Sequence, residues 1–172
     1  MITKDKVFII TGASSGIGSE LAFQLALRGA HVVCAARTMT KLETVCKNIK
    51  GNGGSAIPIQ ADITKKDQCE EVIAQTIKNY KRIDGLVLNA GISMWAKFDE
   101  IKDVGFFRTI MDTNYMGSVY CVHAALPFLK KTKGKIISCS TGQAIMGFPN
   151  HSGYVASKHA LHGFLSTIRM EN

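Results

Sequence analysis

The chain has 172 residues and a formal net charge of +8, with 46% hydrophobic and 20% charged residues. These values are typical of a folded protein with one domain, and no apolar run approaches the roughly 18 residues that a membrane span needs. The densest basic group, residues 130–135, has no interleaved aromatic residues and no nucleic-acid motif around it. We therefore expect no nucleic-acid partner and interpret these basic residues as solvated surface. Binding to nucleic acid driven by the net charge is the third alternative for the function. Binding of an anionic cofactor could account for part of the basic excess.

The N-terminus and the cysteines predict the compartment. The first six residues lead directly into an apolar run and leave no room for a signal peptide. The five cysteines are odd in number and widely spaced, and they show no zinc-binding spacing. We therefore expect reduced, buried thiols in a cytoplasmic protein.

The first elements are a strand, a glycine-rich turn and a helix. Residues 7–10 are an apolar run typical of a buried strand, and residues 19–28 carry apolar side chains at helical spacing. The turn between them, residues 11–18, can bind a pyrophosphate through backbone amides and the positive end of the helix dipole; an ordinary tight turn is the alternative. The candidate cofactor-binding residues of this turn are Gly12, Ser14, Ser15, Gly16, Ile17 and Gly18.

The alternation of strands and helices continues along the chain. Further strands are predicted at residues 31–36, 56–61, 85–88 and 135–139, and further helices at residues 40–50, 64–80, 104–131 and 154–170. Pro58 favours an edge position for the third strand. Thr40 and Glu43 are expected to form a capping box, and either Thr64 or Asp67 opens the third helix. The pattern predicts an α/β fold, a Rossmann-type doubly wound parallel sheet flanked by helices on both faces, in a single dinucleotide-binding domain over residues 1–172.

The end of the second strand indicates which cofactor is bound. About 20 residues past the glycine turn, an acidic side chain would bind the ribose hydroxyls of NAD. The chain has Ala36 followed by Arg37 at this place. A guanidinium cannot accept a hydrogen bond from a hydroxyl, but it pairs with a 2′-phosphate. Arg37 therefore favours NADP(H), with an exposed loop arginine as the alternative.

Tyr154 and Lys158 are the candidate catalytic pair. They are four residues apart on the last predicted helix and so lie on one face of it, a spacing that is also common on helix surfaces. A phenol with a pKa near 10 is a poor proton donor or acceptor at neutral pH. We expect the ammonium, helped by the positive ring of an oxidised nicotinamide, to lower that pKa. The tyrosine can then exchange a proton with a carbonyl or alcohol oxygen as hydride moves.

Together these motifs resemble the short-chain dehydrogenase/reductase superfamily over the whole chain, and most closely its NADP(H)-using members that act on steroids, lipids and other carbonyl compounds. Residues 11–18 resemble the family's glycine turn, and Tyr154 and Lys158 its Tyr-x-x-x-Lys motif. The resemblance implies that Asn114 organises a proton-relay water near the lysine. It also implies that five residues lie close to the cofactor, namely Asp62 and Ile63 beside the adenine ring, and the Asn-Ala-Gly motif of Asn89, Ala90 and Gly91.

The chain departs from the family pattern in two respects. The catalytic serine of the family corresponds here to Thr141, with Ser140 directly before it, and we favour Thr141 slightly over Ser140. A threonine hydroxyl can polarise a carbonyl, although its methyl group stiffens the side chain. Family members usually also run on into further strands, a substrate lid and a loop that grips the nicotinamide. We therefore expect a chain that lacks the C-terminal strands and lid.

The sequence thus predicts an NADP(H)-dependent oxidoreductase that interconverts a carbonyl and an alcohol on a small-molecule substrate. A truncated, catalytically silent cofactor-binding or dimerisation module is the alternative. The resemblance implies a homodimer or homotetramer. Met94 and Trp95 either touch substrate or belong to a plain loop. His159 and His162 lie one turn apart without a third ligand, so we expect no metal site.

Overall fold

The structure, a computed structural model, describes residues 3–172, which form two compact units. The first unit comprises Met1–Ala90 and Tyr120–Cys139, and the second comprises Gly91–Val119 and Ser140–Asn172. All predicted cofactor-binding residues up to Ala90 belong to the first unit. Gly91 and the predicted catalytic residues belong to the second.

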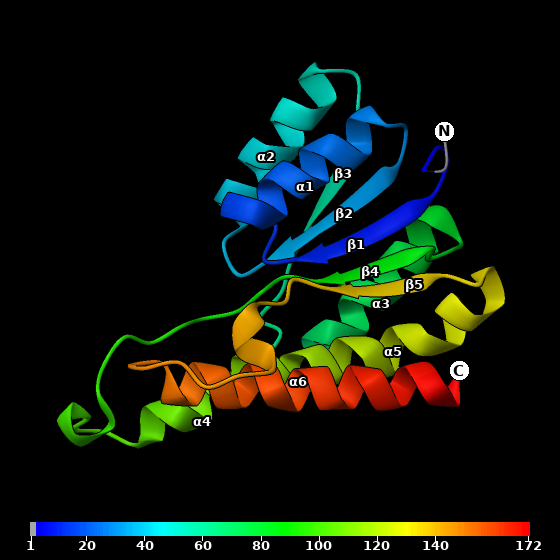
Figure 1. The fold of residues 1–172 in the computed structure, drawn as a ribbon. Coiled ribbons are helices and arrows are strands. Elements are labelled where there is room, and N and C mark those ends of the chain that lie inside the picture. The colour runs from blue at the N-terminus through cyan, green and yellow to red at the C-terminus, as the bar shows by residue number, and fades with distance from the viewer. Residues whose placement is uncertain (1–2) are drawn as a thin grey trace. The chain divides into compact units, whose positions relative to one another are not determined.

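A five-stranded sheet is the framework of the first unit (Figure 1). Its strands are β1 Val7–Thr11, β2 His31–Ala36, β3 Ser55–Gln60, β4 Gly85–Leu88 and β5 Lys135–Ser138. They run in the order β3-β2-β1-β4-β5, and every neighbouring pair is parallel. This confirms the predicted Rossmann-type sheet and places β3, with its Pro58, at an edge. The strand order reverses between β1 and β4, and doubly wound sheets bind their ligands at the carboxyl ends of such a pair.

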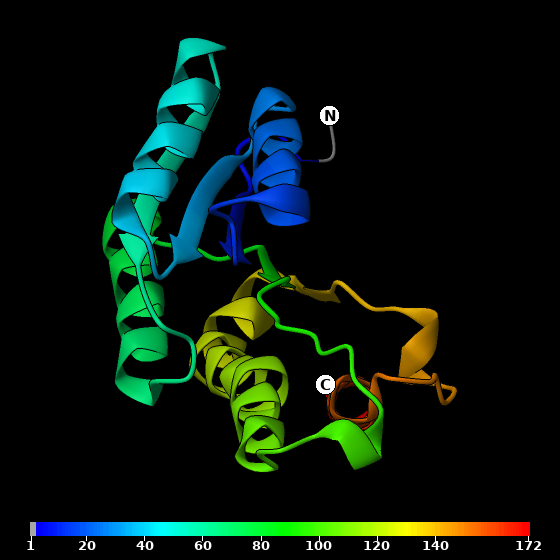
Figure 2. The same ribbon diagram turned by 90° about the vertical axis from the view of Figure 1, so that its left-hand side faces the viewer.

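Helices cover both faces of this sheet. They are α1 Gly16–Leu27, α2 Met39–Gly51, α3 Lys66–Tyr80 and α5 Gly117–Thr132, the last of which enters the first unit at Tyr120. The two views agree that α1 and α2 lie on one face of the sheet and that α3 and α5 lie on the other (Figures 1 and 2). Because the strands are parallel, the chain has to cross over one face of the sheet between one strand and the next, and these helices form the crossovers.

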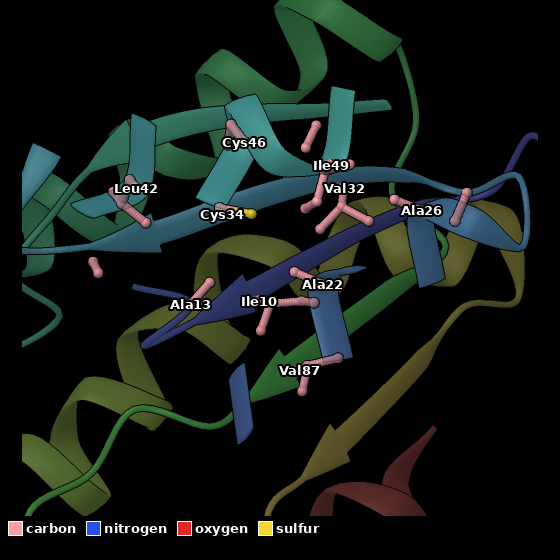
Figure 3. Packing of buried hydrophobic residues seen from close by; sticks show 13 residues of the cluster. Ile10, Ala13, Ala22, Ala26, Val32, Cys34, Leu42, Cys46, Ile49 and Val87 are labelled. Atoms are coloured by element: carbon pink, nitrogen blue, oxygen red, sulfur yellow. The ribbon is translucent and has the colours of Figure 1, made fainter. Parts of the chain in front are cut away.

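A buried cluster fills the space between the sheet and the pair α1 and α2 (Figure 3). Val32, Cys34 and Ala36 project from alternate positions of β2, because side chains on one face of a strand recur every second residue. Ala22 and Ala26 on α1 are small and lie one turn apart, which lets the helix pack closely on the strands. No disulfide joins the five cysteines, all of which lie within residues 3–172, and four of them are buried.

Two predicted helix starts are wrong. The N-cap residue of α2 is Thr38, whose backbone is extended, so Thr40 lies inside the helix and its expected capping box with Glu43 is not formed. The helix α3 begins after Lys65, because the Thr64 side chain and backbone both bond to Asp62 in the preceding turn. At α3 the local turn thus selects a start that the capping pattern does not reveal.

The second unit is mainly helical. It contains η1 Phe98–Glu100, α4 Gly105–Met111, the π-helical turn η2 Asp112–Met116, the start of α5, η3 Gly142–Ala144 and α6 Ser152–Glu171. In place of the single helix predicted over residues 104–131, α4, the π-helical turn η2 and α5 follow one another without a break. No helix within residues 3–172 combines the length and the apolar content needed to cross a membrane.

Asp84 ties together the amino-terminal ends of neighbouring strands. Its Oδ2 accepts hydrogen bonds from the Val7 N–H at 2.9 Å and from Arg82 Nε at 2.8 Å, and its Oδ1 lies 3.3 Å from Lys6 Nζ. Burial acts to raise the pKa of Asp84, but the hydrogen bonds from Arg82, Val7 and Lys6 outweigh it and lower this pKa. The folded protein therefore favours the charged carboxylate.

We expect Asp84→Asn to lower the free energy of unfolding by about 1–3 kcal/mol at neutral pH, because it removes charge-assisted hydrogen bonds. A carboxylate with a lowered folded pKa contributes stability above its unfolded pKa and loses it as the pH falls through the folded value. In urea unfolding, the difference between wild type and variant should therefore shrink below the ordinary aspartate value of 3.8. Asp99→Asn, at an exposed carboxylate, is the control. Equal urea midpoints for both variants at neutral pH would contradict the assignment.

Candidate active site

The glycine turn between β1 and α1 has a backbone that only glycine adopts easily. Gly12 and Gly16 have φ angles of 67° and 57°, in the left-handed region. A Cβ added at Gly12 would lie 2.8 Å from the Ala90 Cα, and one added at Gly18 would lie 2.5 Å from the Gly12 carbonyl oxygen. Gly12 and Gly18 are therefore required by close packing inside the first unit.

The start of α1 fits an anionic group. The N-cap residue Ser15 makes no side-chain cap hydrogen bond, and the first N–H groups of a helix have no partner within the helix. A Cβ added at Gly16 would meet nothing within 4 Å, so this side of the turn is open. Ser15, Gly16 and Ile17 are exposed, and Ser14 is half-buried. Open space, amide donors and the helix dipole together fit the pyrophosphate of a dinucleotide.

Thr11 and Asn89 join the glycine turn to the end of β4. The Thr11 hydroxyl donates to the Val87 carbonyl at 3.2 Å and accepts from the N–H groups of Asn89 and Ala90, both at 3.1 Å. The Asn89 amide donates to the carbonyls of Thr11 at 2.9 Å and Gly12 at 3.2 Å. Asn89 thus acts as a clamp on the turn. The sequence reasoning missed the role of Thr11, although its place at the head of the glycine motif was a usable signal.

The residues predicted for the adenosine end lie on the loops after β2 and β3. Arg37 directly follows β2 and is exposed, while its carbonyl accepts a hydrogen bond from Gln60 Nε2 at 2.9 Å. The Asp62 Oδ1 accepts from the Thr64 N–H at 3.0 Å and from its hydroxyl at 2.9 Å. Ile63 is buried. Arg37 is therefore available for an anionic ligand, whereas one Asp62 oxygen already serves its own turn.

In the second unit, Asn114 lies in the π-helical turn and is 1% exposed. Its Oδ1 accepts from the Ile92 N–H at 2.8 Å, and its Nδ2 donates to the Ile92 carbonyl at 2.9 Å and to Ser157 Oγ at 2.9 Å. The Ser157 hydroxyl donates in turn to the Tyr154 carbonyl at 2.7 Å. The Asn114 side chain is thus committed to holding the segment after Gly91 and the first turns of α6. Ser157, completely buried, is a further residue that the sequence reasoning missed.

Tyr154 and Lys158 lie one turn apart on α6, as predicted. Tyr154 is half-buried and Lys158 is buried, with its Nζ 5.6 Å from the centroid of the Tyr154 ring. Burial raises the pKa of Tyr154. Burial thus opposes the lowering of this pKa that is expected from Lys158 and an oxidised nicotinamide, and the lowering in the presence of that cofactor stays a prediction.

The hydroxyls of Ser140 and Thr141 lie on the segment that leads into η3, which packs against α6. Ser140 is exposed and Thr141 is half-buried. The Thr141 hydroxyl accepts a hydrogen bond from the Gln143 N–H at 3.4 Å. The choice between Thr141 and Ser140 stays a prediction.

Met94 and Trp95, on the segment after Gly91, differ in their exposure to solvent. The Met94 sulfur accepts a hydrogen bond from the Gly153 N–H at 3.2 Å, and the Met94 side chain is buried. Trp95 is 73% exposed. Within residues 3–172 no group of three or more His, Cys, Asp or Glu side chains could hold a metal ion, His159 and His162 included.

The chain matches known sequences over nearly its whole length. Residues 6–172 match the family model of the short chain dehydrogenases. The chain is 41% identical over 167 residues to 11-beta-hydroxysteroid dehydrogenase 1A of Arabidopsis thaliana, which covers 96% of this chain and 48% of that protein. It is 40% identical over 167 residues to 11-beta-hydroxysteroid dehydrogenase A of Sesamum indicum, with the same coverage. The chain thus spans about half the length of these curated relatives.

Solved structures resemble the chain closely. An alcohol dehydrogenase from the archaeon Thermococcus sibiricus, complexed with 5-hydroxy-NADP, has a TM-score of 0.93 at 28% identity, over 97% of this chain and 71% of that one. A metagenomic short-chain oxidoreductase in complex with NADP has a TM-score of 0.93 at 27% identity, over 99% of this chain and 78% of that one. With the parallel sheet, the glycine turn and the Tyr154–Lys158 pair on α6, these matches show that the chain belongs to the short chain dehydrogenase family.

Proposed function

We propose that this chain is an NADP(H)-dependent oxidoreductase that interconverts a carbonyl and an alcohol on a small molecule. The observation that carries the proposal is the pairing on α6 of a half-buried phenol with a buried ammonium, 5.6 Å from the ring centroid. Such a pair is suited to proton exchange with a substrate oxygen. The names of the relatives favour a steroid or another lipid-like carbonyl compound as substrate.

The first unit supplies the proposed cofactor-binding residues. Amides at the start of α1 bind the pyrophosphate, and the Asn89 clamp keeps the turn in shape for it. Arg37 pairs with the 2′-phosphate. A bound nicotinamide cofactor supplies or accepts the hydride of the reaction. The full proposed set is Gly12, Ser14, Ser15, Gly16, Ile17, Gly18, Arg37, Asp62, Ile63, Asn89, Ala90 and Gly91, together with Tyr154 and Lys158.

The second unit supplies the proposed catalytic residues. Tyr154 exchanges the proton with the substrate oxygen, and the positive charge of Lys158 offsets the effect of burial, which raises the pKa of Tyr154. Lys158 stabilises the phenolate that forms when the proton leaves. Thr141, or Ser140, orients the substrate oxygen. Asn114 supports this arrangement through its bonds to Ile92 and Ser157, as a positioning residue.

Initial rates of NADPH oxidation over a panel of ketosteroids and simpler ketones and aldehydes test the proposal, together with the Kd for NADPH. The proposal predicts binding and turnover with at least one carbonyl compound. Binding of NADPH without turnover on the panel would instead favour a silent cofactor-binding module. Absence of NADPH binding would contradict both functions.

Arg37→Ala tests the choice of cofactor. We expect the Kd for NADPH to rise by about tenfold or more, because a bidentate pair with a phosphate is lost, and the Kd for NADH to change by less than about twofold. Isothermal titration with both cofactors measures the two effects. Lys47→Ala removes an exposed charge from α2 and serves as the control for the general loss of basic charge. Equal effects of Arg37→Ala on NADPH and NADH would exclude a 2′-phosphate contact.

A further inference from the structure

His151 is the centre of an aromatic cluster in the second unit that the proposed chemistry does not use. It directly precedes α6 and is 8% exposed. The centroid of its ring lies 4.7 Å from that of Trp95, 5.4 Å from that of Phe148 and 6.0 Å from that of Tyr154, all in edge-on arrangements. The imidazole thus contacts two exposed apolar side chains as well as the phenol.

Hydrogen bonds fix the His151 ring and backbone. The imidazole Nδ1 lies 3.0 Å from the Pro149 carbonyl, and a carbonyl only accepts, so Nδ1 carries the hydrogen. The His151 carbonyl accepts the first hydrogen bond of α6, from the Val155 N–H at 2.8 Å. The preceding carbonyl, that of Asn150, accepts from the Ala96 N–H at 3.0 Å and so ties this loop to the segment that carries Trp95. A ring held at one nitrogen and packed against three aromatic rings has little rotational freedom.

We propose that His151 is a positioning residue for Tyr154, holding the phenol ring against α6 and shielding it from water through the edge-on contact between the two rings. The inference rests on the proposed function, which gives Tyr154 its role. The contact with His151 is one reason why Tyr154 is only half-exposed. Burial raises the pKa of Tyr154, and the His151 ring is one of the groups that excludes water there. Among the charged residues of α6, Lys158 is the one whose Nζ lies over the Tyr154 ring, 5.6 Å from its centroid.

Two substitutions separate the packing of the ring from its hydrogen bond. His151→Ala removes both, whereas His151→Phe keeps an aromatic ring and loses the bond to Pro149. His162→Ala, at an exposed histidine of the same helix, is the control. The first readout is the alkaline titration of tyrosine absorbance, from which the Tyr154→Phe trace is subtracted to isolate Tyr154. The second is the emission of Trp95, the only tryptophan of the chain.

We expect His151→Ala to lower the Tyr154 pKa by about half a unit or more toward its ordinary value, because water reaches the phenol. The Trp95 emission should shift, since its edge-on partner is lost. His151→Phe should restore most of the Tyr154 pKa, and His162→Ala should change neither signal. With an active substrate, kcat should fall by about tenfold in His151→Ala while the KM for NADPH changes by less than about twofold.

An unchanged Tyr154 titration in His151→Ala would overturn the inference, even if the Trp95 emission shifts. A changed titration with an unaltered kcat would also overturn it, because the ring would then shield Tyr154 without positioning it. The titration requires no turnover. Failure of the proposed function would leave wild type without activity and would not alter the optical result.

Discussion

Replacing Tyr154 with Phe is expected to lower kcat for carbonyl reduction by about 10³-fold and to leave the Kd for NADPH within about twofold of wild type. The substitution removes only the hydroxyl that exchanges the proton, and the ring keeps its contacts with His151 and with the Lys158 ammonium. The Asn114–Ser157 bonds reach the Tyr154 backbone, so they are unaffected. Stopped-flow single turnovers and a fluorescence titration with NADPH measure the two quantities.

Tyr115→Phe is the matched control for the loss of a phenolic hydroxyl in the same unit. Tyr115 packs edge-on against Phe164 through its ring, with centroids 6.1 Å apart, and this contact survives the substitution. We expect its kcat to stay within about twofold of wild type. Full activity of Tyr154→Phe would remove the tyrosine from the mechanism. A large loss of kcat in Tyr115→Phe would mean that the lower activity of these variants reflects a disturbed fold and not the loss of the catalytic hydroxyl.

Gly18→Ala is expected to weaken NADPH binding by about 10- to 100-fold, which corresponds to the roughly 1–3 kcal/mol of an overpacked site. The added Cβ would lie 2.5 Å from the Gly12 carbonyl oxygen and would also meet the Asn89 amide. Both are parts of the clamp that shapes the glycine turn, so either the turn opens or the start of α1 moves. The Kd for NADPH, measured by calorimetry, reports this directly.

Gly163→Ala is the control for the same substitution where there is room. Gly163 lies inside α6, and a Cβ added there would meet nothing within 4 Å. Alanine in a helix interior is favoured over glycine by about 0.5–1 kcal/mol, so this variant should unfold at slightly higher urea and bind NADPH unchanged. Wild-type affinity in Gly18→Ala would contradict the role of the glycine turn.

The sequence predicted the sheet well because each strand is a short apolar run bounded by breakers. The second and fourth strands, β2 and β4, match their predicted limits, and Pro58 correctly indicated an edge. Helix starts were less predictable. The Thr64 side chain was a plausible cap, but it bonds to Asp62, and Lys65 became the N-cap residue. Competition between a cap and a neighbouring turn is decided by backbone geometry that the pattern does not contain.

The candidate site shows the same limit. Motif spacing predicted Tyr154, Lys158 and the glycine turn as candidates, since these signals are local in sequence. The contact of Thr11 with Asn89 joins positions 78 residues apart, and that of Asn114 with Ser157 joins positions 43 apart. Such contacts appear only after folding. The effect of burial on the Tyr154 pKa was also out of reach, because it depends on surrounding side chains.

The most direct test of the central claim is hydride transfer itself. NADPH in which both hydrogens of the reactive nicotinamide carbon are replaced by deuterium is incubated with the protein and a carbonyl panel, and the products are analysed by mass spectrometry. The account predicts an alcohol that carries one deuterium with wild type, and a rate of its formation about 10³-fold lower with Tyr154→Phe. An NADPH-saturated wild-type protein that transfers no deuterium to any member of the panel would contradict it.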